Sequence, residues 1–236
     1  MPFLAIWGVK YLGISALFSD FLAHAAAGTL PAVSFLDPRF TILDDGTGND
    51  DHPHADLRSG EHFLGQVYRA VTSGPGWQNT VLIVNRDEWG GFYDTVVPPR
   101  VIAPNNVDTD LDDNGNALLG CRVPVFVVSP FSKSSNPATP RIDSNLYDHT
   151  SVLKFIEWRY SLPPLTKRDA SDEIANLVLA LDFSQPDFSV PTLPNTHQPF
   201  PNPCGIFSFF AQPDNESYDF HRLQNSHLTA EWRKPI

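Results

Sequence analysis

The chain has 236 residues and a formal net charge of −11, from 16 basic and 27 acidic residues. Its length suits a single domain with an additional segment, and 42% apolar residues are enough for a buried core. The acidic balance argues against a nucleic-acid-binding protein, because such proteins usually present a basic face. No uncharged apolar run reaches about 18 residues, so no membrane-spanning helix is expected. Cys121 and Cys204 are too few for a disulfide scaffold or a cysteine-based metal site.

The N-terminal region combines an apolar run with small residues, as a signal peptide does. However, Lys10 lies inside the apolar stretch and no basic segment precedes it. Apolar side chains recur at helical spacing instead, and Gly28 is a suitable C-terminal stop. The residues of this face are Phe18, Phe21, Leu22, Ala25 and Ala26. We therefore expect an amphipathic helix here, with a targeting segment as the alternative.

Three apolar runs have the length of buried strands and end sharply at polar residues or proline. They cover 30–36, 80–84 and 123–128. Runs that are apolar throughout are typical of strands covered on both faces. We therefore expect a largely parallel sheet.

Helical periodicity marks the segments 57–72 and 150–160, with Asp56 and Asp148 as their candidate N-caps. A third helix is expected to begin at Asp169, with its buried face formed by Ile174, Leu177, Val178 and Leu181. Alternating strands and helices predict an α/β fold with a layered core. After these segments proline recurs and the periodicity is lost, which predicts an irregular tail laid over the domain.

Polar side chains with catalytic or metal-binding chemistry gather first in the segment 44–56, just before a predicted helix. This segment holds five carboxylates and two imidazoles: Asp44, Asp45, Asp50, Asp51, Asp56, His52 and His54. Oxygen donors combined with histidine suit a divalent cation or a phosphate ester. A solvated acidic loop that caps the helix is the alternative interpretation.

The adjacent carboxylates Asp87 and Glu88 follow the apolar run 80–84 and stand close to the pair Gly90 and Gly91. Ligands of open α/β sheets bind beyond the carboxyl ends of strands, and a cation offsets the repulsion between neighbouring carboxylates. We therefore predict a metal site here. A turn whose carboxylates face water is the alternative.

Two further segments are more ambiguous. His149 stands at the predicted start of 150–160, where it is either part of a capping motif or next to a phosphate-binding helix start. The segment 110–115 matches the opening of a calcium loop, but Cys121 occupies the position of the last ligand, where Glu is expected. An Asx-rich surface turn is the better interpretation of that segment.

Six motifs in this order resemble the phosphoesterase family of phospholipase C and acid phosphatase enzymes. They are 30–40 (LPAVSFLDPRF), 51–53 (DHP), 87–94 (DEWGGFYD), 122–130 (RVPVFVVSP), 147–151 (YDHTS) and 164–170 (PLTKRDA). The resemblance covers about residues 1–185 and leaves 186–236 as a Pro-rich irregular tail.

The resemblance implies an alkaline-phosphatase-like three-layer α/β/α sandwich that hydrolyses phosphate mono- or diesters. The implied substrates include the headgroup bond of phospholipids, and no nucleic acid is involved. By position in the motifs, Asp87 and Glu88 resemble the family's acidic metal ligands, which implies a divalent metal ion as cofactor. His52 and His149 resemble active-site histidines, and His52 would protonate the leaving group.

The chain departs from the family pattern in two ways. It begins downstream of the family's Glu-Asn-Arg-Ser-type motif and of its Thr or Ser nucleophile, so we expect a domain that lacks its N-terminal part. That missing segment would then be a partner of the site. Thr95 also stands where the family usually has histidine. Because no nucleophile can be named, an inactive truncated remnant or a binding module of the same fold is the alternative to an active hydrolase.

Overall fold

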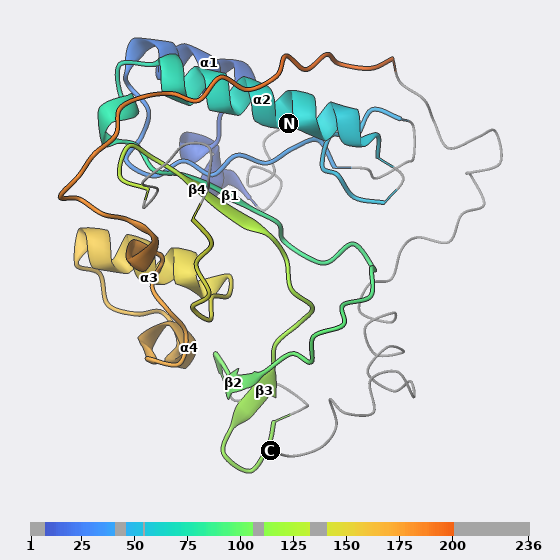
Figure 1. Ribbon diagram of the computed structural model, residues 1–236, viewed down its shortest axis with the longest axis vertical. Coiled ribbons are helices and arrows are strands. Elements are labelled where there is room, and N and C mark those ends of the chain that lie inside the picture. Colours follow the sequence, from blue (N-terminus) through green and yellow to red (C-terminus); the bar gives the residue numbers. More distant parts are fainter. Residues whose placement is uncertain (1–7, 41–45, 54, 106–110, 133–140, 201–236) are drawn as a thin grey trace. The chain divides into compact units, whose positions relative to one another are not determined.

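Figure 1 shows the computed structural model, which describes residues 8–40, 46–53, 55–105, 111–132 and 141–200. Across these residues the fold is mixed α/β, with short strands placed between helices. The chain divides into two compact units, and each is described by itself. Of the described residues, the first unit contains those up to 82 together with 187–200, and the second contains 83–186. The α/β class expected from the sequence is confirmed at this level.

Helix α1, Phe18–Ala27, confirms the amphipathic helix predicted near the N-terminus. It follows a 3-10 helix, η2, at Val9–Ile14, and buries Phe21 and Ala25. It ends at Gly28, whose φ of 70° lies in the left-handed region that side chains disfavour. The glycine therefore stops the helix where the sequence predicts.

Helix α2, Leu57–Ser73, begins at the predicted N-cap. The Asp56 carboxylate accepts a hydrogen bond from the backbone N–H of Arg58 at 2.9 Å, which satisfies one of the open donors of the first turn. The apolar face of α2 packs along α1 (Figure 1), and the rings of Phe18 and Phe63 are 5.2 Å apart. The helix is followed by the 3-10 helix η3, whose bounds are Trp77–Asn79. These contacts form the core of the first unit.

The described part of the predicted Pro-rich tail lies against α2 without regular secondary structure. The hydroxyl of Tyr68 donates a hydrogen bond to the carbonyl of Pro191 at 2.7 Å. The amide of Gln198 donates another to the hydroxyl of Ser59, which is fully buried, at 2.9 Å. This part of the tail is therefore attached to the first unit, while a domain boundary near residue 185 stays a prediction.

Four short strands form two sheets of two strands each in the described part of the chain. Strand β1, Leu82–Asn85, pairs with β4, Val125–Val128, which confirms two of the three predicted strands. Strand β2, Arg100–Ile102, pairs antiparallel with β3, Asn116–Leu118, and places Val101 opposite Ala117. The prediction of a largely parallel sheet is therefore wrong for the described residues, which form two separate sheets, one of them antiparallel. The sequence analysis missed β2 and β3 because three residues are too few for a period-two pattern.

The apolar run 30–36 is not a strand, contrary to the prediction. Its side chains are not buried as a strand core would be, since Val33 is 40% and Phe35 is 69% exposed. Strand structure needs a neighbour that supplies hydrogen-bond partners to every second residue. No strand in the described residues pairs with this run, so its apolar composition alone leaves it irregular.

Helix α3, Thr150–Tyr160, has the predicted bounds. Its aromatic side chains stack toward the segment that follows the 3-10 helix η4, Leu177–Ala180, because the ring of Trp158 is 6.1 Å from that of Phe183. Phe183 in turn lies 5.3 Å from the ring of Phe131, just after β4. These rings connect α3 to the chain on either side of it within the second unit.

The prediction of a helix that begins at Asp169 and buries residues up to Leu181 is wrong. The chain forms α4, Lys167–Ala170, and then the separate 3-10 helix η4, Leu177–Ala180. Asp169 is the third residue of α4 rather than its cap, and its carboxylate accepts hydrogen bonds from the backbone N–H groups that precede the helix. A short capped turn therefore replaces a longer helix, although the predicted apolar residues Ile174, Leu177 and Leu181 are buried.

No helix in the described ranges is long and apolar enough to cross a bilayer.

Candidate active site

The turn after β1 carries the predicted carboxylate pair. Asp87 is exposed and Glu88 is half-buried. The Glu88 carboxylate accepts a hydrogen bond from the backbone N–H of Gly90 at 2.5 Å. Gly90 and Gly91 have φ values of 66° and 75°, both in the left-handed region, so this tight turn requires glycine at each position. The turn thus keeps both carboxylates next to the end of the strand.

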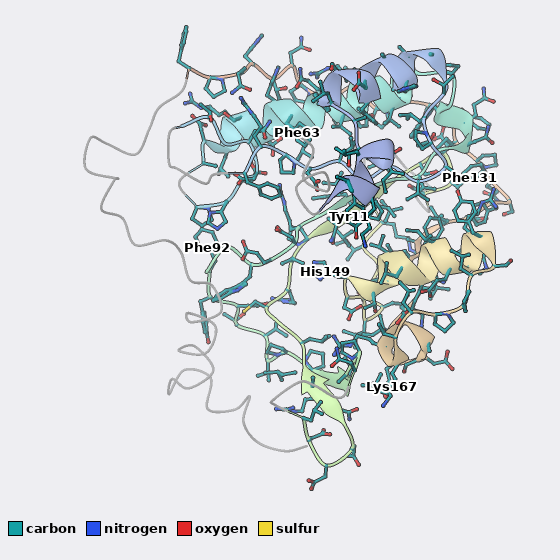
Figure 2. All side chains as sticks on the ribbon, turned by 180° about the vertical axis from the view of Figure 1, so that it is seen from behind. Tyr11, Phe63, Phe92, Phe131, His149 and Lys167 are labelled. Carbon is teal, nitrogen blue, oxygen red and sulfur yellow. The ribbon has the colours of Figure 1, made fainter. Side chains whose placement is uncertain are left out.

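His149 lies at the N-terminal end of α3 (Figure 2) and reaches the same turn. Its Nε2 atom is 2.9 Å from the carbonyl oxygen of Arg86, the residue directly before Asp87. Because a carbonyl only accepts hydrogen bonds, Nε2 is the nitrogen that carries the proton in this contact. His149 thus reaches the backbone directly before Asp87, although it is 63 residues from Arg86 in sequence, and a site shared by His149, Asp87 and Glu88 stays a prediction.

The N-cap residue of α3 is His149, which makes no side-chain cap bond, rather than the predicted Asp148. Neighbouring side chains bind the first polar groups of the helix instead. The Asp148 carboxylate accepts hydrogen bonds from the backbone N–H and the hydroxyl of Thr150 at 2.8 Å and 2.6 Å. The hydroxyl of Ser151 accepts the backbone N–H of Asp148 at 3.1 Å, and the N–H of Ser151 donates to the carbonyl of Asp148. These bonds occupy the first donors of the helix. They favour the capping interpretation of this motif over a phosphate-binding helix start.

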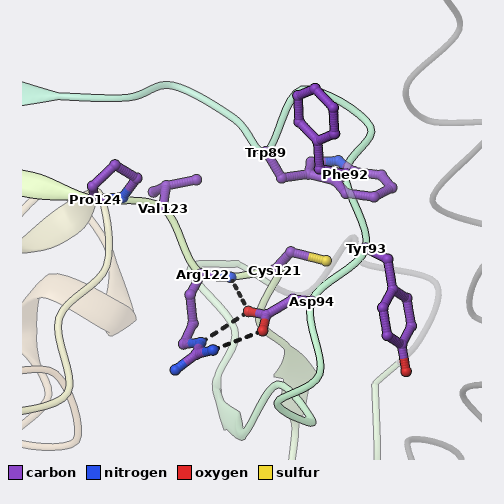
Figure 3. A pocket seen from close by; sticks show the side chains of 8 residues that line it. All are labelled: Trp89, Phe92, Tyr93, Asp94, Cys121, Arg122, Val123 and Pro124. Atoms are coloured by element: carbon purple, nitrogen blue, oxygen red, sulfur yellow. Dashed lines mark hydrogen bonds and ion pairs between the residues drawn. The ribbon is translucent and has the colours of Figure 1, made fainter.

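A pocket of about 430 Å³ lies beside the carboxylate turn (Figure 3). Its lining is aromatic at one end and ionic at the other, and comprises Trp89, Phe92, Tyr93, Asp94, Cys121, Arg122, Val123 and Pro124. Phe92 is 71% exposed and Tyr93 is 53% exposed. The aromatic end thus offers exposed apolar surface in the segment that directly follows Glu88.

The ionic end of the pocket is a two-pronged ion pair. The guanidinium of Arg122 donates to the two carboxylate oxygens of Asp94 at 2.8 Å and 2.9 Å, and its backbone N–H adds a third bond. These hydrogen bonds hold the pKa of Asp94 well below its usual range. Burial raises the pKa of the neighbouring Cys121 thiol. Sequence reasoning gave Asp94 and Arg122 no role, because a pairing across 28 residues leaves no local signal.

His52, the fourth predicted site residue, lies in the first unit and is half-buried. Its Nδ1 atom is 3.0 Å from the carbonyl oxygen of Pro53. The carboxylate of the preceding Asp51 lies against Gly60 in the first turn of α2, where a Cβ atom would overlap it. His52 is thus held near the start of α2, and its meeting with Asp87 in one site stays a prediction. Of the same acidic segment, Asp44, Asp45 and His54 lie outside the described residues.

The metal-binding potential of the site rests on Asp87 and Glu88, whose oxygens are the hard donors that Mg²⁺, Ca²⁺ and Mn²⁺ prefer. Within the described ranges, no three His, Cys, Asp or Glu side chains are placed to hold a metal ion together. The pair therefore fits a divalent ion as a partial set of ligands.

The suggested calcium loop behaves as a surface turn instead. The Asp112 carboxylate accepts the backbone N–H groups of Asn114 and Asn116, each at 2.9 Å. This is the hydrogen-bond pattern of an Asx turn, in which the side chain replaces a backbone acceptor. It agrees with the preferred interpretation of this segment, whose first residue, Asp110, lies outside the described residues.

Comparison with known proteins gives one family and several curated relatives. The family model described as the Phosphoesterase family matches residues 8–163. Non-specific phospholipase C6 of Arabidopsis thaliana is 35% identical over 165 residues, which cover 64% of this chain and 30% of that protein. Phospholipase C B of Mycobacterium tuberculosis (strain H37Rv) is 34% identical over 203 residues, covering 79% and 36%. Non-hemolytic phospholipase C of Burkholderia pseudomallei is 33% identical over 205 residues, covering 76% and 27%. The matched region thus spans about a third of the length of these relatives.

Proposed function

Because the chain belongs to the phosphoesterase family, we propose that it takes part in metal-assisted hydrolysis of phosphate esters. Phospholipid phosphodiesters are the proposed substrate class, since the relatives described above are named phospholipases C. The observation that carries the proposal is the 2.9 Å hydrogen bond between His149 and Arg86. It holds an imidazole beside the turn with Asp87 and Glu88, at the end of a strand where ligands of α/β proteins bind.

In this proposal Asp87 and Glu88 supply two oxygen ligands to a divalent ion, and further ligands come from outside the described residues. The ion would neutralise phosphate charge and lower the pKa of the attacking group. The Nε2 proton of His149 is held by the carbonyl of Arg86, so Nδ1 is the nitrogen that accepts or delivers a proton. His52 would protonate the leaving group.

We extend the proposal to the fold as a three-layer α/β/α sandwich of the alkaline-phosphatase type, built by residues 1–185. The mixed α/β composition of the described residues and the family match over 8–163 support it. The Pro-rich segment 186–236 would then be an appendage to this domain.

The alternative is an inactive remnant or binding module that keeps the family's fold. The partial ligand set favours it. So does the sequence, in which no Thr or Ser stands in the family's nucleophile context.

Metal binding is tested by calorimetry with Mn²⁺ or Mg²⁺ on the complete chain. Asp87→Ala is expected to weaken binding by at least about tenfold, which corresponds to about 1.4 kcal/mol. Asp113→Ala, which removes an exposed carboxylate from the Asx-turn segment, is the matched control and should bind like the parent. Equal affinities in the parent and in Asp87→Ala would assign the ion to another place.

Hydrolysis is tested with a chromogenic phosphodiester in the presence of the same ions. For an active hydrolase, His149→Ala should lower kcat on the order of 10²- to 10⁴-fold, as expected when a general acid or base is lost. Metal binding that depends on Asp87, combined with turnover that is absent from the parent chain, would favour the binding module.

A further inference from the structure

We propose that Arg168 is a positioning residue that aims the His149 imidazole at the carboxylate turn. The proposal deepens the proposed function and rests on His149 being part of that site. Arg168 lies in α4, and its Nε atom donates a hydrogen bond to the carbonyl of Ile102 in β2 at 2.8 Å. Its Nη1 atom is 3.4 Å from a carboxylate oxygen of Asp148, the residue before His149. One side chain thus connects α4, β2 and the start of α3.

Both members of this ion pair are half-buried residues whose charged side chains are largely shielded from solvent. The side chain of Arg168 is 13% exposed and that of Asp148 is 9% exposed. In such surroundings a carboxylate that loses its cation carries a large desolvation cost, so the backbone of Asp148 would move to expose it. The pair therefore resists any change in the position of Asp148.

Because Asp148 directly precedes His149, a fixed position of Asp148 also restricts the backbone of His149 at the start of α3. One of its carboxylate oxygens accepts from Thr150, the other faces Arg168, and its backbone N–H is bound by Ser151. Residues on both sides of His149 are thus fixed. The direction of its ring, and hence the bond from Nε2 to Arg86, follows from that fixed backbone.

The guanidinium is anchored independently of Asp148. Glu173 accepts the backbone N–H of Ile102 at 2.7 Å, while the backbone N–H of Lys167 donates to the carbonyl of Pro104 at 3.3 Å. Together with the bond from Arg168 to Ile102, these contacts hold α4 against the end of β2. Arg168 therefore acts as a fixed support for Asp148 rather than following its movements.

The chemistry of the contact calls for arginine. Arg168 uses two different nitrogens to reach the Ile102 carbonyl and the Asp148 carboxylate. A lysine ammonium is a compact charge without this planar fork, so it can keep the charge but not both directions. Arg168→Lys should consequently preserve the position of His149 only in part.

The test measures which nitrogen of His149 carries the proton, using two-bond ¹H–¹⁵N correlation on the complete chain. Signals of His149 are assigned by their loss in His149→Gln. We expect the Nε2-protonated form to dominate in the parent, both forms to appear in Arg168→Met, and Arg168→Lys to lie between. Lys167→Met, which removes the same charge from an exposed neighbour, should match the parent. Unchanged His149 signals in folded Arg168→Met would overturn the proposal.

If Arg168→Met does not fold, the double variant Arg168→Met with Asp148→Asn removes the stranded charge and keeps an acceptor for Thr150. It should fold and still show both protonated forms of His149, and a parent-like spectrum would again overturn the proposal. Phosphodiester hydrolysis separates the two proposals. Altered His149 signals in the Arg168 variants, with full activity in His149→Gln, would leave Arg168 as a positioning residue and remove His149 from the proposed mechanism.

Discussion

Two arginine–aspartate pairs in the second unit show opposite combinations of geometry and burial. At the pocket, Arg122 bonds both carboxylate oxygens of Asp94 at 2.8 Å and 2.9 Å, but the side chain of Arg122 is 67% exposed while that of Asp94 is 11% exposed. At the start of α3, Arg168 reaches Asp148 at only 3.4 Å, but the two side chains are 13% and 9% exposed. The two aspartates are thus similarly shielded, and the pairs differ in the arginine, which is exposed to solvent at the pocket and largely shielded at the start of α3.

This difference indicates that the stability lost on removing one arginine depends more on how far its guanidinium is shielded from solvent than on its distance from the carboxylate. Water and salt screen an exposed guanidinium, so a surface pair contributes little even with good geometry. Removing one member of a buried pair leaves an uncompensated charge in a low-dielectric environment. We therefore expect Arg168 to matter more than Arg122 for stability.

The largest effect is expected from Arg168→Met. Because it strands the Asp148 carboxylate, it should lower the free energy of unfolding by about 3–5 kcal/mol, measured by chemical denaturation. Adding Asp148→Asn should recover much of this loss, since no buried charge is left. A loss below about 1 kcal/mol, the range of exposed pairs, would break the comparison.

Ser151→Ala should have an intermediate effect at the same helix start. Ser151 is 1% exposed and accepts the backbone N–H of Asp148. Loss of a cap-type hydrogen bond costs about 1 kcal/mol in the free energy of unfolding. Ser144→Ala, at an exposed position, is the control and should leave the denaturation midpoint unchanged.

Arg122→Met should have the smallest effect, and this effect should depend on pH. The Arg122 hydrogen bonds keep the pKa of Asp94 below its ordinary value of 3.8 in the folded protein. A lowered folded pKa stabilises the protein above the unfolded value, and this stabilisation is lost as pH falls through the folded value. Parent and variant should therefore differ at pH 7 and converge in strong acid.

Unfolding measured at several pH values and salt concentrations checks this. The difference between the parent and Arg122→Met should also shrink as salt is added. A pH-independent difference would mean that Arg122 acts through packing of its aliphatic stem rather than through its charge.

Local patterns predicted much of the secondary structure and part of the candidate site. Helices α2 and α3, the cap at Asp56 and the carboxylates after β1 follow from periodicity and from residues at helix or strand ends. The run 30–36 shows the limit of such patterns, because a strand forms only where a partner is available. The segment after Asp169 shows the same limit, since its apolar residues are buried without continuing the helix.

The sequence by itself determined the family motifs, the cap at Asp56 and the apolar faces of α1 and α2, because each depends on residues only a few positions apart. Only the tertiary structure decided that His149 meets Arg86, 63 residues away, and that Arg168 meets Asp148, 20 residues away. The physical reason is that these contacts are made by side chains on separate elements. Their directions are set by how α3, α4 and β2 pack, and that packing leaves no periodic trace in the chain.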